Sequence, residues 1–484
     1  MADATTYDAM TDKLAALSAA NIAFAEARRG SRPERQPVHT VYGGAQLFKS
    51  DTAPKMGAIA RRHLLQYAPD FIVFMRAFGL RGADRVDRRA HAAELLDLVA
   101  NGSLAALKDK DRDAWLGATV FRRVLHKIES EPIEDFRIDF EDGFGVRTSE
   151  IEDREARRAA GETVAGLNQG TLPPFIGIRI KPLNEEYRDR SLRTLRLYLE
   201  ELLSGSDGRL PPFFVVTLPK ITVPEQVSVL AAALDEIERR YGLQPGSIGI
   251  ELMIETPASI FDRRGLPAIP ALVEAAEGRC TGAHFGVYDY TALLEITANH
   301  QQMGHDACDF ARHVMQVALA GTGVWISDGA TNVMPVAPHR PAEGGRLTTE
   351  QEHENIESVH GAWRLAYNDI MHSLRSGFYQ GWDLHPAQLA ARYAAVYTFF
   401  LEGFDAAAER LRSFVDKAAQ ATLVGNIFDD AATGQGLLNY FLRAVNSGAI
   451  SMDEAAETGL TMDEFRSRSF SHIVKERTSR LAEQ

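Results

Sequence analysis

Short runs of apolar residues alternate with longer amphipathic stretches through most of the chain. Eight of these runs have the length of strands, and the segments between them have helical spacing. The runs are residues 38–48, 136–140, 175–180, 213–218, 248–254, 283–287, 323–326 and 377–384. Strands that alternate with helices form parallel β/α units, and eight such units favour a closed barrel over an open sheet. The pattern predicts an α/β protein with a (β/α)8 TIM barrel.

The remaining segments read as helices or loops. Residues 8–29 are rich in alanine with apolar positions at helical spacing, and a long segment between the first two runs reads as several helices. The Pro/Gly-rich residues 335–345 predict a loop at the active rim, which is either a lid or a plain surface loop. No strand pattern returns after Leu384. We therefore expect a helical N-terminal segment (1–35), a barrel (36–390) with a helical insertion at about 52–132, and a C-terminal helical domain (391–484).

Composition and charge exclude several classes of protein. The chain of 484 residues is 45% hydrophobic and 25% charged, which is ordinary for a globular protein. A net charge of −13 argues against binding to nucleic acid, because no basic field is available to replace counterions on phosphates. Only Cys280 and Cys308 are present, and the acidic N-terminus has no apolar signal core, so we expect a cytoplasmic protein. The most apolar stretch, residues 71–78, is too short to span a membrane.

Polar side chains alternate with apolar ones along three of the predicted strands. Side chains of a strand point alternately to its two faces, so each of these strands has one polar and one apolar face. The polar faces carry Arg137, Asp139 and Glu141 in the second run, Arg179 and Lys181 in the third, and Glu251 and Glu255 in the fifth. Strands buried on both faces are normally apolar on both. We therefore expect the polar faces to line the barrel interior and the apolar faces to meet the helices.

Two carboxylates, Glu255 and Asp289, directly follow consecutive apolar runs, where they would meet at one rim of the barrel. Buried carboxylates are costly unless a cation meets them. At the rim we count Asp139, Glu141, Glu255 and Asp289 against the bases Arg179, Lys181 and Lys220. A divalent cation would compensate the excess of negative charge once an anionic substrate binds. Oxygen ligands favour Mg²⁺ over Zn²⁺, with Mn²⁺ as the alternative, and two protein ligands leave positions for water and substrate.

Structural roles remain open for several of these groups. An aspartate after a strand often caps the next helix, so Asp142 has two readings, catalysis and capping. Glutamate is a poor cap, which favours the metal reading of Glu255. Glu251 lies one layer deeper and is expected to pair with a base such as Arg179 or Lys220. Arg179 is either that salt-bridge partner or the group that recognises a substrate carboxylate or a developing oxyanion.

Several short motifs follow one another in the order of a known superfamily. They are Ile138-Asp-Phe-Glu-Asp-Gly143, Ile178-Arg-Ile180, Ile254-Glu-Thr256, Gly286-Val-Tyr-Asp-Tyr-Thr291, Ser327-Asp-Gly329 and Leu384-His-Pro-Ala-Gln388. Over residues 134–390 the chain resembles the malate synthase and citrate lyase β-subunit superfamily, which includes the HpcH/HpaI aldolases. The resemblance implies a barrel of the phosphoenolpyruvate/pyruvate-binding type, Glu255 and Asp289 as metal ligands, Arg179 as the strand arginine, and Gly286 and Tyr288 beside the site.

A further match lies near the C-terminus. Phe428-Asp-Asp-Ala-Ala-Thr433, with the amphipathic residues 437–448 after it, is similar to the malate synthase segment Met-Glu-Asp-Ala-Ala-Thr and its following helix. In that family the aspartate before Ala-Ala-Thr is the general base, which assigns the role to Asp430. The alternative is that Asp429 and Asp430 cap a helix. The chain departs from the family in its compactness and in its first strand, where no motif matches.

These residues imply an enzyme that makes or breaks a carbon–carbon bond. We expect Mg²⁺ on Glu255 and Asp289 to chelate a small 2-oxo acid, Arg179 to stabilise an enolate or alkoxide, and Asp430 to move the proton, with an acyl-CoA such as acetyl-CoA as partner. Asp139, Glu141, Asp142, Lys181 and Lys220 are assigned to substrate binding or to support of the ligands. We also expect a homo-oligomer. The alternatives are a pyruvate-type class II aldolase that uses free aldehydes without CoA, and a non-catalytic barrel that only binds.

Overall fold

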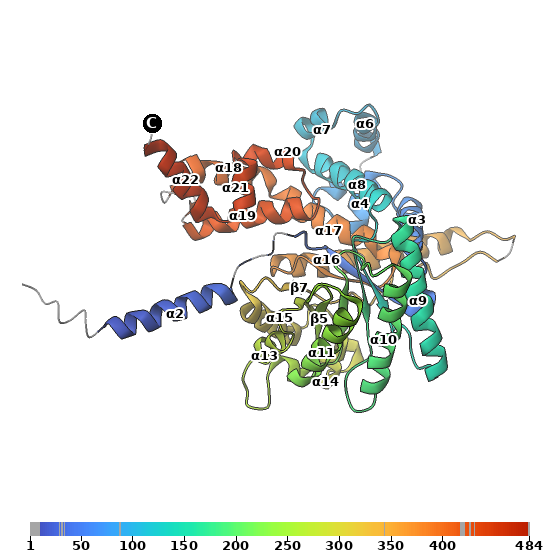
Figure 1. Ribbon diagram of the computed structural model, residues 1–484. Coiled ribbons are helices and arrows are strands. Elements are labelled where there is room, and N and C mark those ends of the chain that lie inside the picture. Colours follow the sequence, from blue (N-terminus) through green and yellow to red (C-terminus); the bar gives the residue numbers. More distant parts are fainter. Residues whose placement is uncertain are drawn as a thin grey trace, which may run out of the picture. The chain divides into compact units, whose positions relative to one another are not determined.

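Eight parallel strands form a nearly closed (β/α)8 barrel, as the sequence predicts (Figure 1). The computed structural model describes residues 10–482 except 29, 31, 33, 87–88, 343, 417–421, 425–426 and 430. The strands are β1 (His39–Gly44), β2 (Asp135–Asp139), β3 (Phe175–Arg179), β4 (Val215–Leu218), β5 (Gly249–Ile254), β6 (Cys280–Phe285), β7 (Trp325–Ser327) and β8 (Gly381–Asp383). They are hydrogen bonded in the order β7-β6-β5-β4-β3-β2-β1-β8, in which sequence neighbours are spatial neighbours.

The chain divides into two compact units, which are described separately. The first comprises residues 1–35, 140–157 and 177–328, and the second comprises residues 36–139, 158–176 and 329–484. The domain boundaries expected at residues 35 and 390 stay a prediction. In the part of the chain that the structure describes, no helix is both long and apolar enough to cross a membrane.

The first unit contains β4 to β7 and the helices that connect them. These elements are α10 (Arg188–Gly205), α11 (Pro224–Tyr241), α12 (Pro257–Ile260), α13 (Ile269–Glu274), α14 (Val287–Leu293), the 3-10 helix η2 (Ala298–His300) and α15 (Asp306–Leu319). Parallel pairing runs without a break from the end of β3 through β7. All described apolar residues of β4 and β5 are buried, because helices cover the outer face of the barrel.

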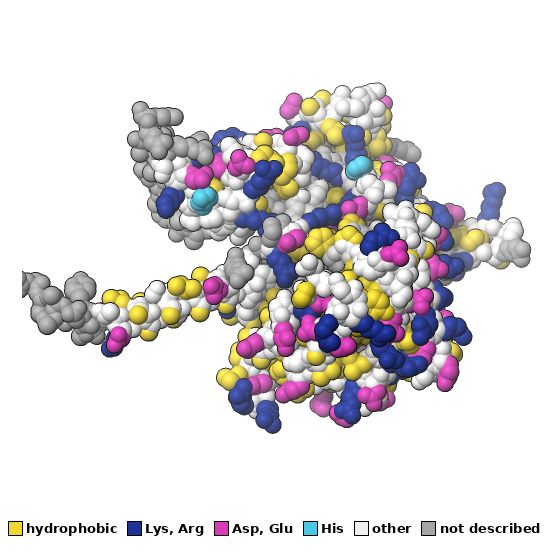
Figure 2. All heavy atoms as spheres, in the orientation of Figure 1, with side chains coloured by type: hydrophobic (Ala, Val, Ile, Leu, Met, Phe, Trp, Pro, Cys, Tyr) yellow, Lys and Arg dark blue, Asp and Glu magenta, His cyan; other side chains and the backbone are white. Residues whose placement is uncertain are grey.

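The N-terminal helix α2 (Thr11–Ala27) also belongs to the first unit. It confirms the helix expected over residues 8–29, but none of its residues is buried. Hydrophobic side chains therefore lie on the surface along the length of this helix, as Figure 2 shows.

The second unit contains β1, β2 and β8 with the helical insertion. The insertion consists of α3 (Thr52–Tyr67), α4 (Phe71–Phe78), α5 (Ala83–Val86), α6 (Arg89–Ala100), α7 (Leu104–Lys110) and α8 (Arg112–Ser130), preceded by the 3-10 helix η1 (Ala45–Leu47). The apolar stretch at residues 71–78 is the core helix α4. Asp70 caps its start by accepting from the amide of Val73 at 2.9 Å, and Gly79 ends it in the left-handed conformation at φ 67°.

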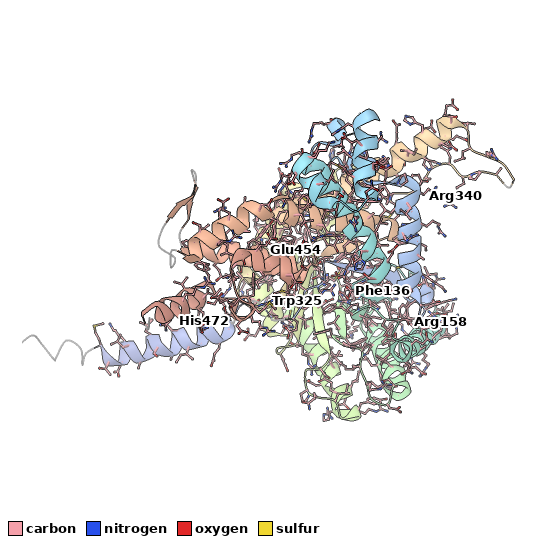
Figure 3. All side chains as sticks on the ribbon, turned by 90° about the horizontal axis from the view of Figure 1, so that it is seen from above. Phe136, Arg158, Trp325, Arg340, Glu454 and His472 are labelled. Carbon is pink, nitrogen blue, oxygen red and sulfur yellow. The ribbon has the colours of Figure 1, made fainter. Side chains whose placement is uncertain are left out.

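Helix α9 (Ser149–Gln169) follows β2 and is joined to the segment after β1. Arg158 of α9, labelled in Figure 3, donates hydrogen bonds to the backbone carbonyls of Ala45 and Phe48. Ala45 is the first residue of η1 and Phe48 is the residue after it. The guanidinium thus binds carbonyls of the turn that follows β1.

After β7 the chain continues into the helices of the second unit. They are α16 (Thr349–Arg375), η3 (Pro386–Gln388), α17 (Leu389–Glu402), α18 (Phe404–Asp416), α19 (Ala431–Asn446), α20 (Met452–Ala455), η4 (Ala456–Thr458), α21 (Met462–Ser467) and α22 (Phe470–Ala482). Thr348 and Gln351 form a capping box at the start of α16.

The C-terminal region is a helical extension, as the sequence predicts, but the expectation that no strand follows Leu384 is wrong. Strands β9 (Thr422–Val424) and β10 (Ile427–Asp429) pair in antiparallel fashion. Each is a short run of β-branched or apolar residues, and only Gly425 and Asn426 separate them in the sequence. A two-residue connection of this composition is a hairpin signal, and it outweighs the helical spacing of the surrounding sequence.

Candidate active site

The carboxyl ends of β3 to β6 bring the charged residues of the first unit together. The amide of Gly286 donates to the carbonyl of Ile254 at 3.1 Å, which ties the end of β6 to the end of β5. The amide of Lys220 donates to Oε1 of Glu255 at 2.7 Å and ties the loop after β4 to the same place. Carboxyl ends of parallel barrel strands form the rim where active sites lie.

Glu141 and Asp142 meet both bases of this rim. Nη1 of Arg179 lies 3.2 Å from Oε2 of Glu141 and 3.7 Å from Oδ2 of Asp142. Nζ of Lys220 forms an ion pair with Glu141 and lies 3.2 Å from Oδ1 of Asp142. The amide of Phe140 donates to the carbonyl of Arg179 at 2.9 Å, and this hydrogen bond sets the two carboxylates beside the end of β3. Asp142 is thus an ion-pair partner here.

Lys220 links these two carboxylates to Glu255 and Asp289. Its backbone has φ 51°, a left-handed conformation that costs a non-glycine residue about 1 kcal/mol or more. In this conformation the amide binds Glu255, and Nζ lies 3.7 Å from Oδ1 of Asp289 while it pairs with Glu141. The surrounding carboxylates raise the pKa of Lys220 despite its burial, so the side chain stays cationic.

The ionised form of Glu255 is disfavoured. Its side chain is 1% exposed, and burial, with the nearby charge of Asp289, raises its pKa to about 8. Glu141 has a similar environment, since burial and the charge of Asp142 raise its pKa to about 7 against the opposing effect of Arg179. The pKa of Asp142 is lowered by Arg179 and Lys220, which outweigh its own burial. The positive charges of Arg179 and Lys220 thus offset the burial of Glu255 only in part.

Gly286 is required by the close approach of Glu255. A Cβ atom at this position would lie 2.5 Å from both Cβ and Oε2 of Glu255, a distance that side-chain atoms do not tolerate. Asp289 follows in the first turn of α14, and its side chain is 38% exposed, unlike the buried Glu255. Tyr288 is half-buried in the same turn.

Two other expected residues lie in different surroundings, and a third lies outside the described residues. Lys181 pairs with Glu152 of α9 at 3.0 Å and donates to the carbonyl of Phe140, instead of joining the cluster around Lys220. Asp139 is 1% exposed at the end of β2 and belongs to the second unit. Asp430, the expected general base, lies outside the described residues.

Glu251, one layer below Glu255, has a partner that the sequence interpretation missed. Its Oε2 lies 3.1 Å from Nε2 of His284 and accepts from the hydroxyl of Thr217 at 2.9 Å. Met253 and His284 are in register across β5 and β6, which is consistent with this contact. The sequence of β6 contains the signal, because His284 is a basic side chain in a buried strand.

Two of the motifs that resemble the superfamily have structural contacts. Asp328, after β7, is fully buried and accepts from Nε of Arg312 on α15 with both oxygens at 2.9 Å. His385 and Gln388 cap the turn after β8, where the amide of Leu384 donates to Oε1 of Gln388 at 2.8 Å. These residues shape the loops that follow the last two strands.

The rim cluster would carry more negative than positive charge only with all four of its carboxyl groups ionised, and burial opposes that for Glu141 and Glu255. Four carboxylates, Glu141, Asp142, Glu255 and Asp289, face two bases, Arg179 and Lys220. Both bases are engaged mainly by Glu141 and Asp142. Among the described residues no three His, Cys, Asp or Glu side chains gather into a complete metal site. The pair Glu255 and Asp289 has the donor chemistry of a hard cation that completes its shell with water or substrate oxygens, so these residues fit Mg²⁺.

The fold and the cluster define a barrel protein with an acidic site at the carboxyl ends of its strands. A family model described as "Domain of unknown function (DUF6986)" matches residues 17–473. The chain belongs to this family. No curated protein matches it.

Several solved structures resemble the chain. A citrate lyase from Burkholderia xenovorans LB400 has 19% sequence identity and a TM-score of 0.48, with 70% of this chain and 92% of that chain covered. A lead(II) complex of Haloferax volcanii malate synthase has 14% identity and a TM-score of 0.39, with 75% and 94% covered. A pyruvate/acetyl-CoA ternary complex of that synthase has 16% identity and a TM-score of 0.37, with 74% and 93% covered. Sequence identities and TM-scores this low do not establish the activity of this chain.

Proposed function

We propose that the protein is a Mg²⁺-dependent enzyme that makes or breaks a carbon–carbon bond next to the carbonyl of a 2-oxo acid, through an enolate. The observation that carries the proposal is the pair of carboxyl groups of Glu255 and Asp289, which interact with each other and are only partly compensated by Lys220. A divalent cation would balance the four carboxylates of the rim. The motifs that resemble the malate synthase and citrate lyase β-subunit superfamily support the same assignment.

Glu255 and Asp289 would hold the cation, and Asp289 is the more exposed of the two. The cation would supply Lewis-acid polarisation of the 2-oxo acid and neutralise developing negative charge. Gly286 lets the Glu255 carboxylate lie against the backbone, and the Lys220 amide orients one of its oxygens. Support of this kind fixes the ligand before the cation binds, which lowers the cost of binding.

Arg179 would stabilise the oxygen of the enolate or alkoxide. Its guanidinium is 5% exposed at the end of β3 and is oriented by Glu141, so its charge acts in a poorly hydrated site. Asp430 would move the proton between the reacting carbon and solvent, as the superfamily resemblance implies. In the condensing direction it takes a proton from a methyl group beside a thioester carbonyl, and in the cleaving direction it returns one.

Metal binding provides the first test. Calorimetric titration with Mg²⁺ should give a binding isotherm for the full chain, and Glu255→Gln and Asp289→Asn should each abolish it. Asp306→Asn is the matched control, because Asp306 is an exposed aspartate in the first turn of another helix of the same unit. Binding that survives Glu255→Gln, or that is lost equally in Asp306→Asn, would show that the pair does not hold the cation.

Enolate formation provides the second test. Exchange of methyl protons in deuterated water is followed by NMR for acetyl-CoA and for a panel of 2-oxo acids, each with and without Mg²⁺. The proposal predicts Mg²⁺-dependent carbon–carbon bond chemistry that requires Arg179, and loss of proton exchange in Asp430→Asn. Turnover of free aldehydes with pyruvate and without CoA would favour the aldolase alternative, and absence of any exchange with intact Mg²⁺ binding would favour a binding protein.

A further inference from the structure

Lys220 contacts both of the proposed cation ligands. Its backbone amide donates to Oε1 of Glu255 at 2.7 Å, and its Nζ atom lies 3.7 Å from Oδ1 of Asp289. Among the described residues, no other basic side chain lies within ion-pair distance of Glu255 or Asp289. The ammonium group of Lys220 is therefore the one described cation that pairs with Asp289.

The other two carboxylates of the rim already have a second base. Nη1 of Arg179 lies 3.2 Å from Oε2 of Glu141 and 3.7 Å from Oδ2 of Asp142. Lys220 also pairs with Glu141, and its Nζ atom lies 3.2 Å from Oδ1 of Asp142. Glu141 and Asp142 thus share two bases, whereas Asp289 has Lys220 alone among the described residues. Loss of the Lys220 ammonium group would therefore affect Asp289 most.

The loop after β4 holds Lys220 in this place. The φ angle of Lys220 is 51°, a left-handed conformation that is costly for residues other than glycine. The hydroxyl of Thr256, which directly follows Glu255, donates to the carbonyl of Ile221 at 2.6 Å. The amide of Lys220 and the carbonyl of Ile221 thus both bind the end of β5. A lysine occupies a position where glycine would fit the backbone better, which indicates a role for its side chain.

A cation bound by Glu255 and Asp289 would compete with this ammonium group. Two cations that share one carboxylate repel each other, and the repulsion is strong where water screens it poorly. Screening is limited here, because the Lys220 side chain is 31% exposed and Glu255 is buried. Mg²⁺ carries two charges and the ammonium group one, so Mg²⁺ is the stronger competitor for Asp289. Lys220 would keep Glu141 and Asp142 as partners.

We propose that Lys220 is an internal counter-cation of the metal site, whose ammonium group pairs with Asp289 in the metal-free protein and yields this carboxylate to Mg²⁺. This role rests on the proposed function, which supplies the two metal ligands, and it extends that function to the metal-free state. An empty acidic site destabilises a fold, because its carboxylates repel one another. Lys220 reduces that repulsion and thereby lowers the affinity of the site for Mg²⁺.

The affinity for Mg²⁺ provides the first test. Mg²⁺ alone is titrated calorimetrically into the full chain and its variants. Lys220→Met keeps the backbone amide and the length of the side chain but removes the charge, so it should bind Mg²⁺ about tenfold more tightly than the unaltered protein. This gain outweighs the added competition from protons at Glu255, because a proton carries one charge and Mg²⁺ carries two. Lys220→Arg restores the charge and should restore the lower affinity.

Thermal unfolding provides the second test. In the presence of chelator, Lys220→Met should unfold at a lower temperature than the unaltered protein. Addition of Mg²⁺ should reduce this difference, since a ligand that binds more tightly to the folded state stabilises it more. Lys181→Met is the matched control, because Lys181 is a half-buried lysine of the same unit that pairs with Glu152 at 3.0 Å, outside the cluster. Its lower unfolding temperature should not be restored by Mg²⁺.

The outcomes separate this role of Lys220 from the metal site itself. If the unaltered chain binds Mg²⁺ and Lys220→Met binds it with equal or weaker affinity, the counter-cation is refuted while the metal site stands. Equal recovery of Lys181→Met and Lys220→Met on addition of Mg²⁺ would also overturn the counter-cation. If neither the unaltered chain nor Lys220→Met binds Mg²⁺, the proposed metal site is refuted, and the counter-cation with it.

Discussion

Gly286→Ala is expected to disable the metal site without unfolding the protein. The added Cβ would lie 2.5 Å from Cβ and Oε2 of Glu255, whereas carbon atoms in contact lie about 3.5–4.0 Å apart. One of the two groups must therefore move by about 1 Å. Glu255 is held on its other side by the amide of Lys220 at 2.7 Å, so the displacement breaks or lengthens that hydrogen bond.

The expected cost has two parts. Overpacking of a buried site destabilises a protein by about 1–3 kcal/mol. A shift of about 1 Å in a group that positions the reacting centre can lower the rate by about a hundredfold. Mg²⁺ affinity should fall as well, because a displaced carboxylate no longer shares the cation with Asp289 in the geometry that the cluster sets.

Gly282→Ala is the matched control, because Gly282 lies on β6, the strand that ends just before Gly286. A Cβ at Gly282 would meet its nearest atom, Cγ of Glu251, at 3.5 Å, which is an ordinary contact. The assays are thermal unfolding in the presence of chelator, for stability, and calorimetric titration with Mg²⁺, for the site. If Gly286→Ala binds Mg²⁺ as tightly as the unaltered protein, or if Gly282→Ala is impaired to the same degree, the close packing of Glu255 on Gly286 is not what positions the ligand.

Two further predictions concern stability. Asp383 is buried, which opposes its ionisation, but Arg392 and His39 lower its pKa to about 2. Its ionised form therefore stabilises the fold above about pH 4. This contribution, on the order of 2 kcal/mol, is lost as the pH falls toward 2. Asp383→Asn should lose that part of the acid-unfolding slope in pH-dependent denaturant titrations; an unchanged slope would contradict it. Gly79→Ala should lower the free energy of unfolding by about 1 kcal/mol, because the φ of Gly79 is 67°. Gly161→Ala in α9, where a Cβ meets nothing within 4 Å, should raise the free energy of unfolding by up to about 1 kcal/mol. Equal effects of the two substitutions in urea denaturation would refute the backbone argument.

The barrel was predictable because its strands are short apolar runs with helical segments between them. Burial by helices on the outer face imposes that pattern wherever the sheet is parallel. Glu255 and Asp289 were also predictable as neighbours, since both follow consecutive strands and the carboxyl ends of parallel strands share one rim. The hairpin of β9 and β10 was missed because its strands are only three residues long, and the Gly-Asn connection was its sole strong signal.

The contacts of individual side chains could be predicted less well from the sequence. Alternation places Lys181 on the same face as Arg179, but its long side chain reaches Glu152 of α9 instead. The role of Asp142 could not be decided from its position, because a residue after a strand can cap a helix or bind a base. Alternation fixes the direction in which a side chain leaves the backbone. It does not fix where the end of a flexible side chain lies.

The burial of Glu255 and Glu141 is unfavourable for the stability of the fold, although both residues belong to the candidate active site. A carboxyl group whose pKa is raised on folding contributes most to stability at low pH, and that contribution is lost as the pH rises through the folded pKa. With pKa values of about 8 and about 7, both groups work against the folded state near neutral pH. Selection for stability alone would place an apolar residue at 255, as it has at Met253 two positions earlier on the same face. The buried acid at this position destabilises the fold, and destabilising residues of this kind are retained where activity depends on them.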